Sequence, residues 1–222
     1  MENIDFDLVN KEFRINGFPD ARKIINLEQT KLHHRARQLA HLVLHRNDLT
    51  FAKNSLSQIP LVHDENRFLA EALWRAAIVH FVKCFTSAKS RSKLSEDKLF
   101  KSEPPEVMAS YNYLKDLRDK HFVHDENAWA QCKTAALVND GSKSFKIEKI
   151  VCQSVHIQTL EPNNFTNLTL LVDKALSWVI GEFDKKCVEL TEELEKLSYA
   201  ELIAFPSPEI KIPDAAGVSQ VR

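Results

Sequence analysis

The sequence has few of the residues that interrupt regular secondary structure. Its 222 residues include only four glycines and eight prolines, so long helices meet few breaks. Its four cysteines are scattered without a CxxC pair, at Cys84, Cys132, Cys152 and Cys187. Because disulfide frameworks belong mostly to short secreted chains, we expect free thiols in a reducing compartment.

Long apolar runs and a large net charge are also absent. No stretch approaches the roughly 18 apolar residues of a membrane span. The first residues, Met1 to Asp7, lack the basic start and the apolar run of a signal peptide. We therefore expect a cytoplasmic protein with no membrane partner. The formal net charge of -1 argues against a general nucleic-acid coat protein.

The composition that is present indicates a globular chain with a sizeable core. Apolar residues make up 44% and charged residues 27%, so we do not expect the whole chain to be disordered. Positive charge is concentrated between Ala21 and Lys53, where seven basic residues stand against two acidic ones. This face, with Arg35 and Arg37, is a weak candidate for RNA binding, although a solvated helix face is the simpler explanation.

The apolar pattern predicts an all-α protein, an up-and-down helical bundle with a small inserted β-hairpin. We expect an N-terminal arm at 1–18, one helical domain at 19–205 and a flexible, proline-containing tail at 206–222. The helix expected at about 63–87 is apolar around most of its circumference, which is typical of a central helix. The hairpin is expected near 134–158, around the turn-forming run Asn139-Asp140-Gly141-Ser142.

Capping and breaking residues predict the other helix boundaries. The first helix is expected from Pro19 to about Arg46, with a stop at Asn47-Asp48 and a short helix at 49–57. A later helix starts at Pro105 and ends near Phe122. The last long helix starts near Asn164, and Gly181 within it marks a close helix contact or a bend.

A polar segment ends the helix that starts at Pro105. It reads Leu117-Arg118-Asp119-Lys120-His121-Phe122-Val123-His124 and holds two basic donors and two imidazoles. Arginine binds phosphate through a planar fork of donors, and histidine transfers protons near neutral pH. RNA supplies its own nucleophile, the 2′-hydroxyl, so its cleavage needs a proton-transfer group and a cation for the phosphorane charge. An arginine and a histidine meet this need without a metal.

The same segment resembles the motif of the HEPN superfamily, in which a polar residue follows an arginine and a histidine comes four to six positions after that arginine. The resemblance is specific over about 107–127, general for the helical bundle and absent for residues 1–60 and the hairpin. It implies a HEPN-like bundle and a metal-independent endoribonuclease in defence, such as abortive infection, or in a toxin–antitoxin system. It also implies a homodimer in which both motifs line one cleft, with RNA as substrate and an antitoxin protein as a further partner.

The resemblance assigns roles within the motif. Arg118 and His124 are the expected catalytic residues, and Asp119 is the expected orienting group. Lys120 is a weak candidate for RNA contact. Because Arg118 and His124 are six residues apart, they lie ~120° from a common face of an ideal helix. The helix must therefore end or loosen before His124, or the two groups must meet across a dimer, and His121 is the alternative imidazole.

The bare spacing of arginine and histidine is not specific. It also occurs from Arg35 to His41 and from Arg75 to His80, but an alanine follows the arginine in both cases. Only Arg118 is followed by a polar residue at a charged helix end. The structural alternative is a polar helix C-terminus whose cationic side chains complement the helix dipole.

Other chemistry finds little support in the sequence. His41 and His45 have metal-ligand spacing, but no acidic or cysteine ligand accompanies them, so we expect no metal and no cofactor. Two further functions stay open. One is a non-catalytic module of the same fold that binds RNA, a nucleotide or a protein, which the acidic flank Asp125-Glu126 favours because it repels phosphate. The other is a helical scaffold without a nucleic-acid role.

Overall fold

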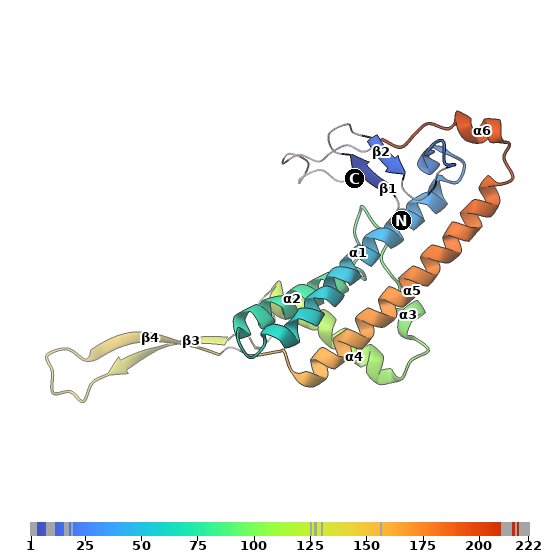
Figure 1. The fold of residues 1–222 in the computed structure, drawn as a ribbon. Helices are drawn as coiled ribbons and strands as arrows, with labels where there is room; N and C mark the ends of the chain where they lie inside the picture. Colours follow the sequence, from blue (N-terminus) through green and yellow to red (C-terminus); the bar gives the residue numbers. More distant parts are fainter. Residues whose placement is uncertain are drawn as a thin grey trace. The chain divides into compact units, whose positions relative to one another are not determined.

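The structure is a computed structural model that forms two compact units. It describes residues 4–7, 12–15, 18, 20–124, 126, 128–129, 131–155, 157–209, 215 and 217, with the backbone alone for 4–7 and 12–15. One unit is built from Met1–Ala40 and Phe183–Arg222, and the other from His41–Glu182. Helices α1 (His33–Val62) and α5 (Pro162–Leu194) contribute residues to both units (Figure 1). The expectation of one domain at 19–205 stays a prediction.

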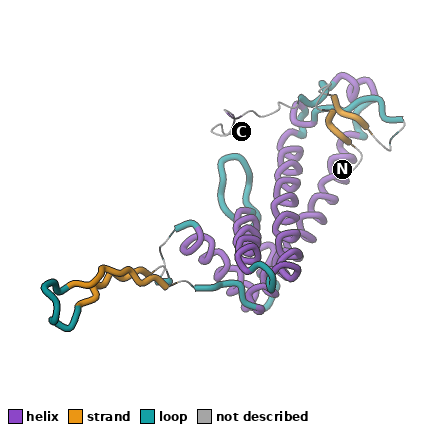
Figure 2. The backbone as a smooth tube through the Cα atoms, turned by 60° about the vertical axis from the view of Figure 1, so that its left-hand side comes forward, coloured by secondary structure: helices purple, strands orange, loops and turns teal. Residues whose placement is uncertain are grey.

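Helices make up most of the described chain, which confirms the predicted all-α class with an inserted hairpin (Figure 2). The remaining elements, in chain order, are β1 (Ile4–Asp7), β2 (Glu12–Ile15), η1 (Leu27–Gln29), α2 (Arg67–Lys83), α3 (Glu96–Phe100), α4 (Pro105–Asp116), η2 (Leu117–Phe122), β3 (Gln131–Val138), β4 (Ile147–Val155) and α6 (Tyr199–Ala204). None of the described helices is long and apolar enough to cross a membrane.

Helix α1 continues through the break that the sequence predicts at Asn47-Asp48. The prediction of a stop there, and of a separate helix at 49–57, is wrong. Asp48 does not cap a new helix, because its carboxylate accepts hydrogen bonds from His80, Lys83 and Arg91. Pro60 lies in the last turn of α1, so the backbone bond that it removes is close to the end of the helix.

The start of α1 also differs from the prediction. The helix begins at His33 rather than near Pro19. Residues 27–29 form a short 3-10 turn instead, which Asn26 caps by accepting a hydrogen bond from the N–H of Glu28 at 3.0 Å. The side chain of Asn26 thus takes a backbone donor at the start of this turn, as asparagine often does at the start of a helix.

Helix α2 supplies the centre of the core in the second unit. Trp74, Ile78 and Phe81 are fully buried, and the indole of Trp74 donates to the hydroxyl of Thr159 at 3.0 Å. The prediction of a central apolar helix is therefore confirmed. The first turn of α2 is different, because the side chain of Phe68 there is 85% exposed.

Aromatic packing joins the turn just after α2 to α3 and α4, the two helices that follow. The ring centroids of Phe85, Phe100 and Tyr111 lie 5.1–5.8 Å apart, in tilted and edge-on arrangements that aromatic pairs prefer. Pro105 occupies the first turn of α4, as predicted, because a missing N–H costs nothing there. This packing fixes α4, which carries the arginine–histidine motif at its end.

Strands β3 and β4 form the inserted hairpin, which confirms the prediction near 134–158. They pair antiparallel from Gln131 opposite Val155 to Val138 opposite Ile147, with a register shift at Leu137/Val138. In the connecting turn, Gly141 has a φ of +84°, a conformation that favours glycine. Among the strand residues only Val151 is half-buried, and the others are exposed.

Helix α5 is the long last helix of the prediction. It begins at Pro162 and continues through Gly181. A Cβ added at Gly181 would meet no atom within 4 Å, so the interpretation of this glycine as a close helix contact is wrong. A short helix, α6, follows and is capped by Ser198, whose hydroxyl and backbone N–H exchange hydrogen bonds with Glu201 in a capping box.

The segment predicted as an N-terminal arm contains paired strands. β1 and β2 are antiparallel, with Ile4 opposite Ile15. Lys23 donates to the backbone carbonyls of Ile203 and Phe205 at 2.6 Å, which ties residues after the arm to the end of α6. Most of the tail predicted at 206–222 lies outside the described residues.

Candidate functional site

The predicted motif lies on a π-helix at the end of α4. Helix α4 ends at Asp116, and Leu117–Phe122 continue it as the π-helix η2, whose wider turn is closed by a 3.1 Å bond from the N–H of Val123 to the carbonyl of Arg118. Single π turns inside or at the end of α-helices are often found at functional sites. The regular helix thus loosens before His124, which is one of the two conditions that the sequence set.

Arg118 and Asp119 are joined directly. Arg118 Nη1 donates to Asp119 Oδ1 at 2.5 Å, with the two side chains 26% and 35% exposed. The carboxylate holds the guanidinium by a charge-assisted hydrogen bond, which restricts its orientation. Arg118 Nε is buried and has no hydrogen-bond partner. The orienting role expected of Asp119 is chemically available in this arrangement.

His121 lies between two aromatic rings. Its ring centroid is 5.5 Å from that of Phe122 and 5.6 Å from that of Trp129, the latter nearly edge-on at 77°. Its Nδ1 is buried without a hydrogen-bond partner. Buried polar atoms are usually satisfied, and those that are not often mark a functional group. The motif therefore holds two such atoms, Nε of Arg118 and Nδ1 of His121.

His124 lies beyond the π-helix and is exposed. Within the described residues, hydrogen bonds and ring contacts join Arg118 to Asp119, and His121 to Phe122 and Trp129. These contacts do not bring Arg118 together with either imidazole inside one chain.

The weak RNA-contact candidates are placed as follows. Lys120 is half-exposed and pairs with Asp116 at 3.0 Å. Arg35 pairs with Glu193 at 3.8 Å, and Arg37 is exposed. Arg35 and Arg37 belong to the first compact unit, whereas Arg118 belongs to the second. Salt bridges as exposed as these contribute little to stability, so both pairs can open to a ligand.

Arg75 contacts the motif from α2 and was missed as a site residue. Its guanidinium carbon lies 4.9 Å from the centre of the Phe122 ring, and its Nε donates to Glu71 at 3.0 Å. A cation over an aromatic ring is attracted by the ring's negative face. The sequence did contain a sign of this, since Glu71 and Arg75 have the i, i+4 spacing of a helical ion pair. The pair fixes the position of Phe122, the neighbour of His121.

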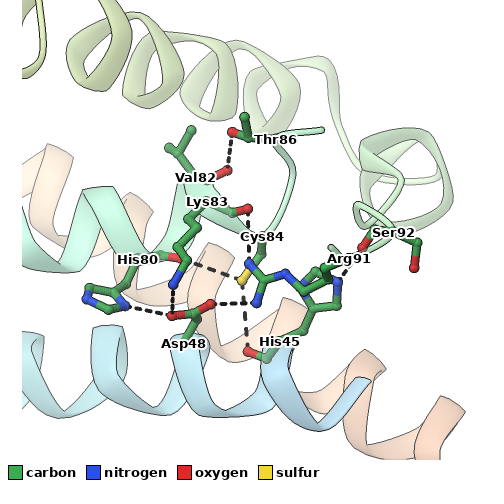
Figure 3. A network of polar contacts seen from close by, with 9 residues as sticks. All are labelled: His45, Asp48, His80, Val82, Lys83, Cys84, Thr86, Arg91 and Ser92. Atoms are coloured by element: carbon green, nitrogen blue, oxygen red, sulfur yellow. Dashed lines mark hydrogen bonds and ion pairs between the residues drawn. The ribbon is translucent and has the colours of Figure 1, made fainter. Parts of the chain in front are cut away.

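A second polar cluster surrounds Asp48 on α1 (Figure 3). Oδ1 of Asp48 accepts hydrogen bonds from His80 Nδ1 at 2.8 Å and from Lys83 Nζ at 3.0 Å, and Oδ2 accepts one from Arg91 Nη1 at 2.7 Å. The side chains of Asp48 and Arg91 are only 10% and 9% exposed. Sequence reasoning missed this cluster, because its members lie up to 43 residues apart in the chain.

Burial and hydrogen bonds act in opposite directions in this cluster. Burial by itself would raise the pKa of Asp48, but the hydrogen bonds from Arg91, Lys83 and His80 outweigh it and hold the pKa below its usual value of 3.8. The nearby thiol of Cys84 has no such donors, and burial raises its pKa to about 12. Cys84 is therefore a protonated thiol and no nucleophile at neutral pH.

A groove runs along α4 and α5 and does not include the motif. It consists of two adjoining hollows of about 450 and 240 Å³ that share Ser110 and Asn167. The larger hollow has an ion pair on its wall, between Lys174 and Glu103 at 2.5 Å. None of the motif residues lines either of these two hollows.

Metal ligands do not gather in the described part of the chain, where no group of three or more His, Cys, Asp or Glu side chains could hold an ion. In comparisons with known proteins, no family model, no curated protein and no solved structure matched this chain. A function for the protein therefore has to be inferred from its own residues.

Proposed function

We propose that this protein is a metal-independent endoribonuclease of the HEPN type, acting on RNA in a defence or toxin–antitoxin setting. The observation that carries the proposal is the π-helix at the end of α4, in which Asp119 holds Arg118 at 2.5 Å. The same short segment carries two imidazoles, and Nε of Arg118 and Nδ1 of His121 have no protein partner. A phosphate and a transferred proton are the kinds of partner that such groups take.

The proposed reaction uses the RNA's own 2′-hydroxyl as nucleophile. His124 accepts the proton of this hydroxyl as its oxygen attacks the adjacent phosphorus. The bond from phosphorus to the 5′-oxygen then breaks, and that oxygen takes up a proton, so the products carry a 2′,3′-cyclic phosphate and a 5′-hydroxyl. Arg118 stabilises the additional charge on the phosphorane. Asp119 orients Arg118, and His121 is the alternative proton-transfer group.

The roles are divided between two copies of the chain in this proposal. Among the described residues, no hydrogen bond joins Arg118 to either imidazole within one chain, and we place Arg118 of one protomer opposite His124 of its partner. A symmetric homodimer then holds two such sites in one cleft. An antitoxin protein would act by covering this cleft.

The first test is cleavage of RNA in the presence of EDTA. Purified protein is incubated with structured and single-stranded RNA beside the variants Arg118→Ala, His124→Ala and His121→Ala. Proton transfer contributes about 10²–10⁴-fold in rate, and loss of a charge-stabilising group can cost as much. We expect His124→Ala and Arg118→Ala to lose activity by at least about 100-fold, and EDTA to have no effect. The matched control is Lys101→Ala, an exposed change at the end of α3 that leaves every residue of the proposed site in place.

Mixing the two inactive variants tests the shared site. A heterodimer of Arg118→Ala and His124→Ala keeps one intact pairing of Arg118 with His124, so random exchange restores about a quarter of the wild-type activity. Cleavage that survives both single substitutions would remove the mechanism. If the mixture stays inactive while each variant forms dimers, the catalytic pair does not form across the interface.

A non-catalytic binding module is the second candidate. The observation in its favour is that the hydrogen bond of Arg118 goes to Asp119, and that no hydrogen bond to an imidazole is found among the described residues. A module of this kind binds RNA and returns it intact. Binding of RNA that depends on Arg118, together with no cleavage of any RNA by the folded dimer, would establish this candidate instead.

A further inference from the structure

The connection from α2 to α3 is the most basic short segment of the second unit. From Lys83 to Ser95 the chain contains Lys83, Lys89, Arg91 and Lys93 and no acidic residue. The same segment carries five hydroxyl side chains, namely Thr86, Ser87, Ser90, Ser92 and Ser95. Lysine and arginine, with serine and threonine beside them, are the side chains that contact the nucleic-acid backbone most often.

This connection is held in a defined conformation by the rest of the unit (Figure 3). The N–H of Leu94 donates to the carbonyl of Cys84 at 2.8 Å, and Leu94 itself is buried. His45 Nε2 donates to the carbonyl of Ser92 at 2.8 Å, and Ala88 pairs with Arg91 in a short antiparallel bridge. The loop therefore presents its cationic side chains from a fixed backbone, which lowers the entropy lost on binding.

The charges around Asp48 do not balance. Its one carboxylate faces two permanent cations, Lys83 and Arg91, as well as the imidazole of His80. Arg91 is nearly buried at 9% exposure and acts as the anchor, whereas Lys83 is 52% exposed and can also face a ligand. Lys89 is exposed on the turn that follows. The surface thus keeps a net positive charge next to the ion pair.

We propose that Lys83 and Lys89, positioned by the Asp48–Arg91 pair, bind the phosphate backbone of single-stranded RNA. This inference rests on the proposed function and adds a surface that holds the substrate outside the Arg118 motif. A membrane is the less suitable partner, because residues 86–93 contain no large apolar side chain to insert into lipid. Arg91 has a positioning role, since its own donors are used by Asp48 and by the carbonyl of Lys83.

The test measures binding by fluorescence anisotropy in the His124→Ala background, where RNA stays intact. The probe is a fluorescein-labelled oligouridylate of about 20 nucleotides, long enough to exceed a typical single-strand site. The double variant Lys83→Met/Lys89→Met is compared with Lys143→Met/Lys174→Met, which changes the net charge equally. Like Lys83, Lys143 and Lys174 are half-exposed and paired, with Glu148 and Glu103. Lys83→Arg, which keeps the charge, is the variant for rescue.

We expect the first double variant to bind at least about tenfold more weakly at low salt, because two phosphate contacts are lost. The slope of log K against log salt should fall by about 1.4, at about 0.7 for each contact with a single strand. The control double variant and Lys83→Arg should bind as the parent does. A circular dichroism melt shows whether each variant is folded, and Lys89→Met alone, on the exposed turn, should give half of the change in slope.

The other possible results bear differently on the RNA-binding surface and on the proposed ribonuclease. Equal weakening by both double variants, or no binding of the oligouridylate by the parent, overturns the proposed surface. Cleavage that depends on Arg118 while binding ignores Lys83 and Lys89 overturns the surface and leaves the ribonuclease standing. Binding that depends on these lysines without any cleavage supports the surface and removes the ribonuclease. Binding of phosphatidylserine vesicles instead of RNA by the same lysines also overturns it.

Discussion

His45 and Asp48 lie one turn apart on α1, and burial affects their protonation in different ways. Asp48 keeps its charge, because three donors face its carboxylate. His45 donates through Nε2 to the carbonyl of Ser92, while its buried Nδ1 has no partner. Burial therefore lowers the pKa of His45 from 6.5 to about 4, although the bond to Ser92 acts in the opposite direction. The folded state therefore favours the neutral imidazole of His45 over the protonated one.

The pH dependence of stability should report this difference. Because the pKa of His45 is about 4 when folded and 6.5 when unfolded, the unfolded chain binds more protons between these values. Stability from this group is complete above pH 6.5 and is lost as the pH falls toward 4. The loss amounts to at most about 1.4 kcal/mol for each pH unit. Urea unfolding at several pH values measures it.

His45→Gln removes the titrating group and keeps a donor for the carbonyl of Ser92. Its free energy of unfolding should therefore fall less steeply than that of the wild type as the pH decreases from 6.5 to 4. His63→Gln is the matched control, because the side chain of His63 is 48% exposed. If the free energy of unfolding of His45→Gln falls with pH as steeply as that of the wild type, the imidazole of His45 does not cause the loss of stability.

At the scale of the element, the π-helix η2 changes how the six-residue spacing between Arg118 and His124 places the two side chains. On a continuous α-helix, Arg118 and His124 would lie on different faces. The π turn that closes on Arg118 widens the end of the helix, and the regular structure stops before His124. Phe122 is fixed by Arg75 of α2 at 4.9 Å, so a neighbouring helix supports the turn. His124 is left free of the helical geometry that separated it from Arg118.

Helix α5 gives a prediction for stability. Gly181 has ordinary helical surroundings, and a Cβ there would meet no atom within 4 Å. Gly181→Ala should raise the free energy of unfolding by about 1 kcal/mol, because alanine loses less backbone entropy than glycine in a helix. Urea denaturation followed by circular dichroism measures the change. Gly141→Ala is the opposite control and should destabilise the hairpin turn, because Gly141 has a φ of +84°. A loss of stability in Gly181→Ala would mean that this position has a role in binding or bending.

At the scale of the whole molecule, the proposal requires an assembly of two chains. Light scattering at micromolar concentration should give a mass of about twice the 25.5 kDa of one chain. The reason is that, among the described residues, no hydrogen bond joins Arg118 to His121 or His124 within one chain. A mass of one chain at every concentration would contradict the shared site, whatever the activity of the protein.

Several features could be predicted from the sequence because they depend on local patterns. The apolar circumference of α2 predicted its burial, and Asn139-Asp140-Gly141 predicted the hairpin turn. The polar residue after Arg118 indicated the pair that the structure contains. The predictions that Asp48 caps a new helix and that Gly181 marks a close helix contact were wrong. Those interpretations depended on neighbours that local spacing does not reveal.

The sequence by itself determined the helical class, the hairpin and the position of the motif at a helix end, because these follow from periodicity and from turn and capping residues near one another in the chain. Tertiary structure alone decided that α1 continues through Asp48, since Lys83, Arg91 and the imidazole of His80 occupy that carboxylate. It also decided that Arg75 contacts Phe122 and that a π turn carries Arg118. The contacts of Asp48 and of Arg75 join groups that are distant in the sequence, and local patterns do not reveal such pairs.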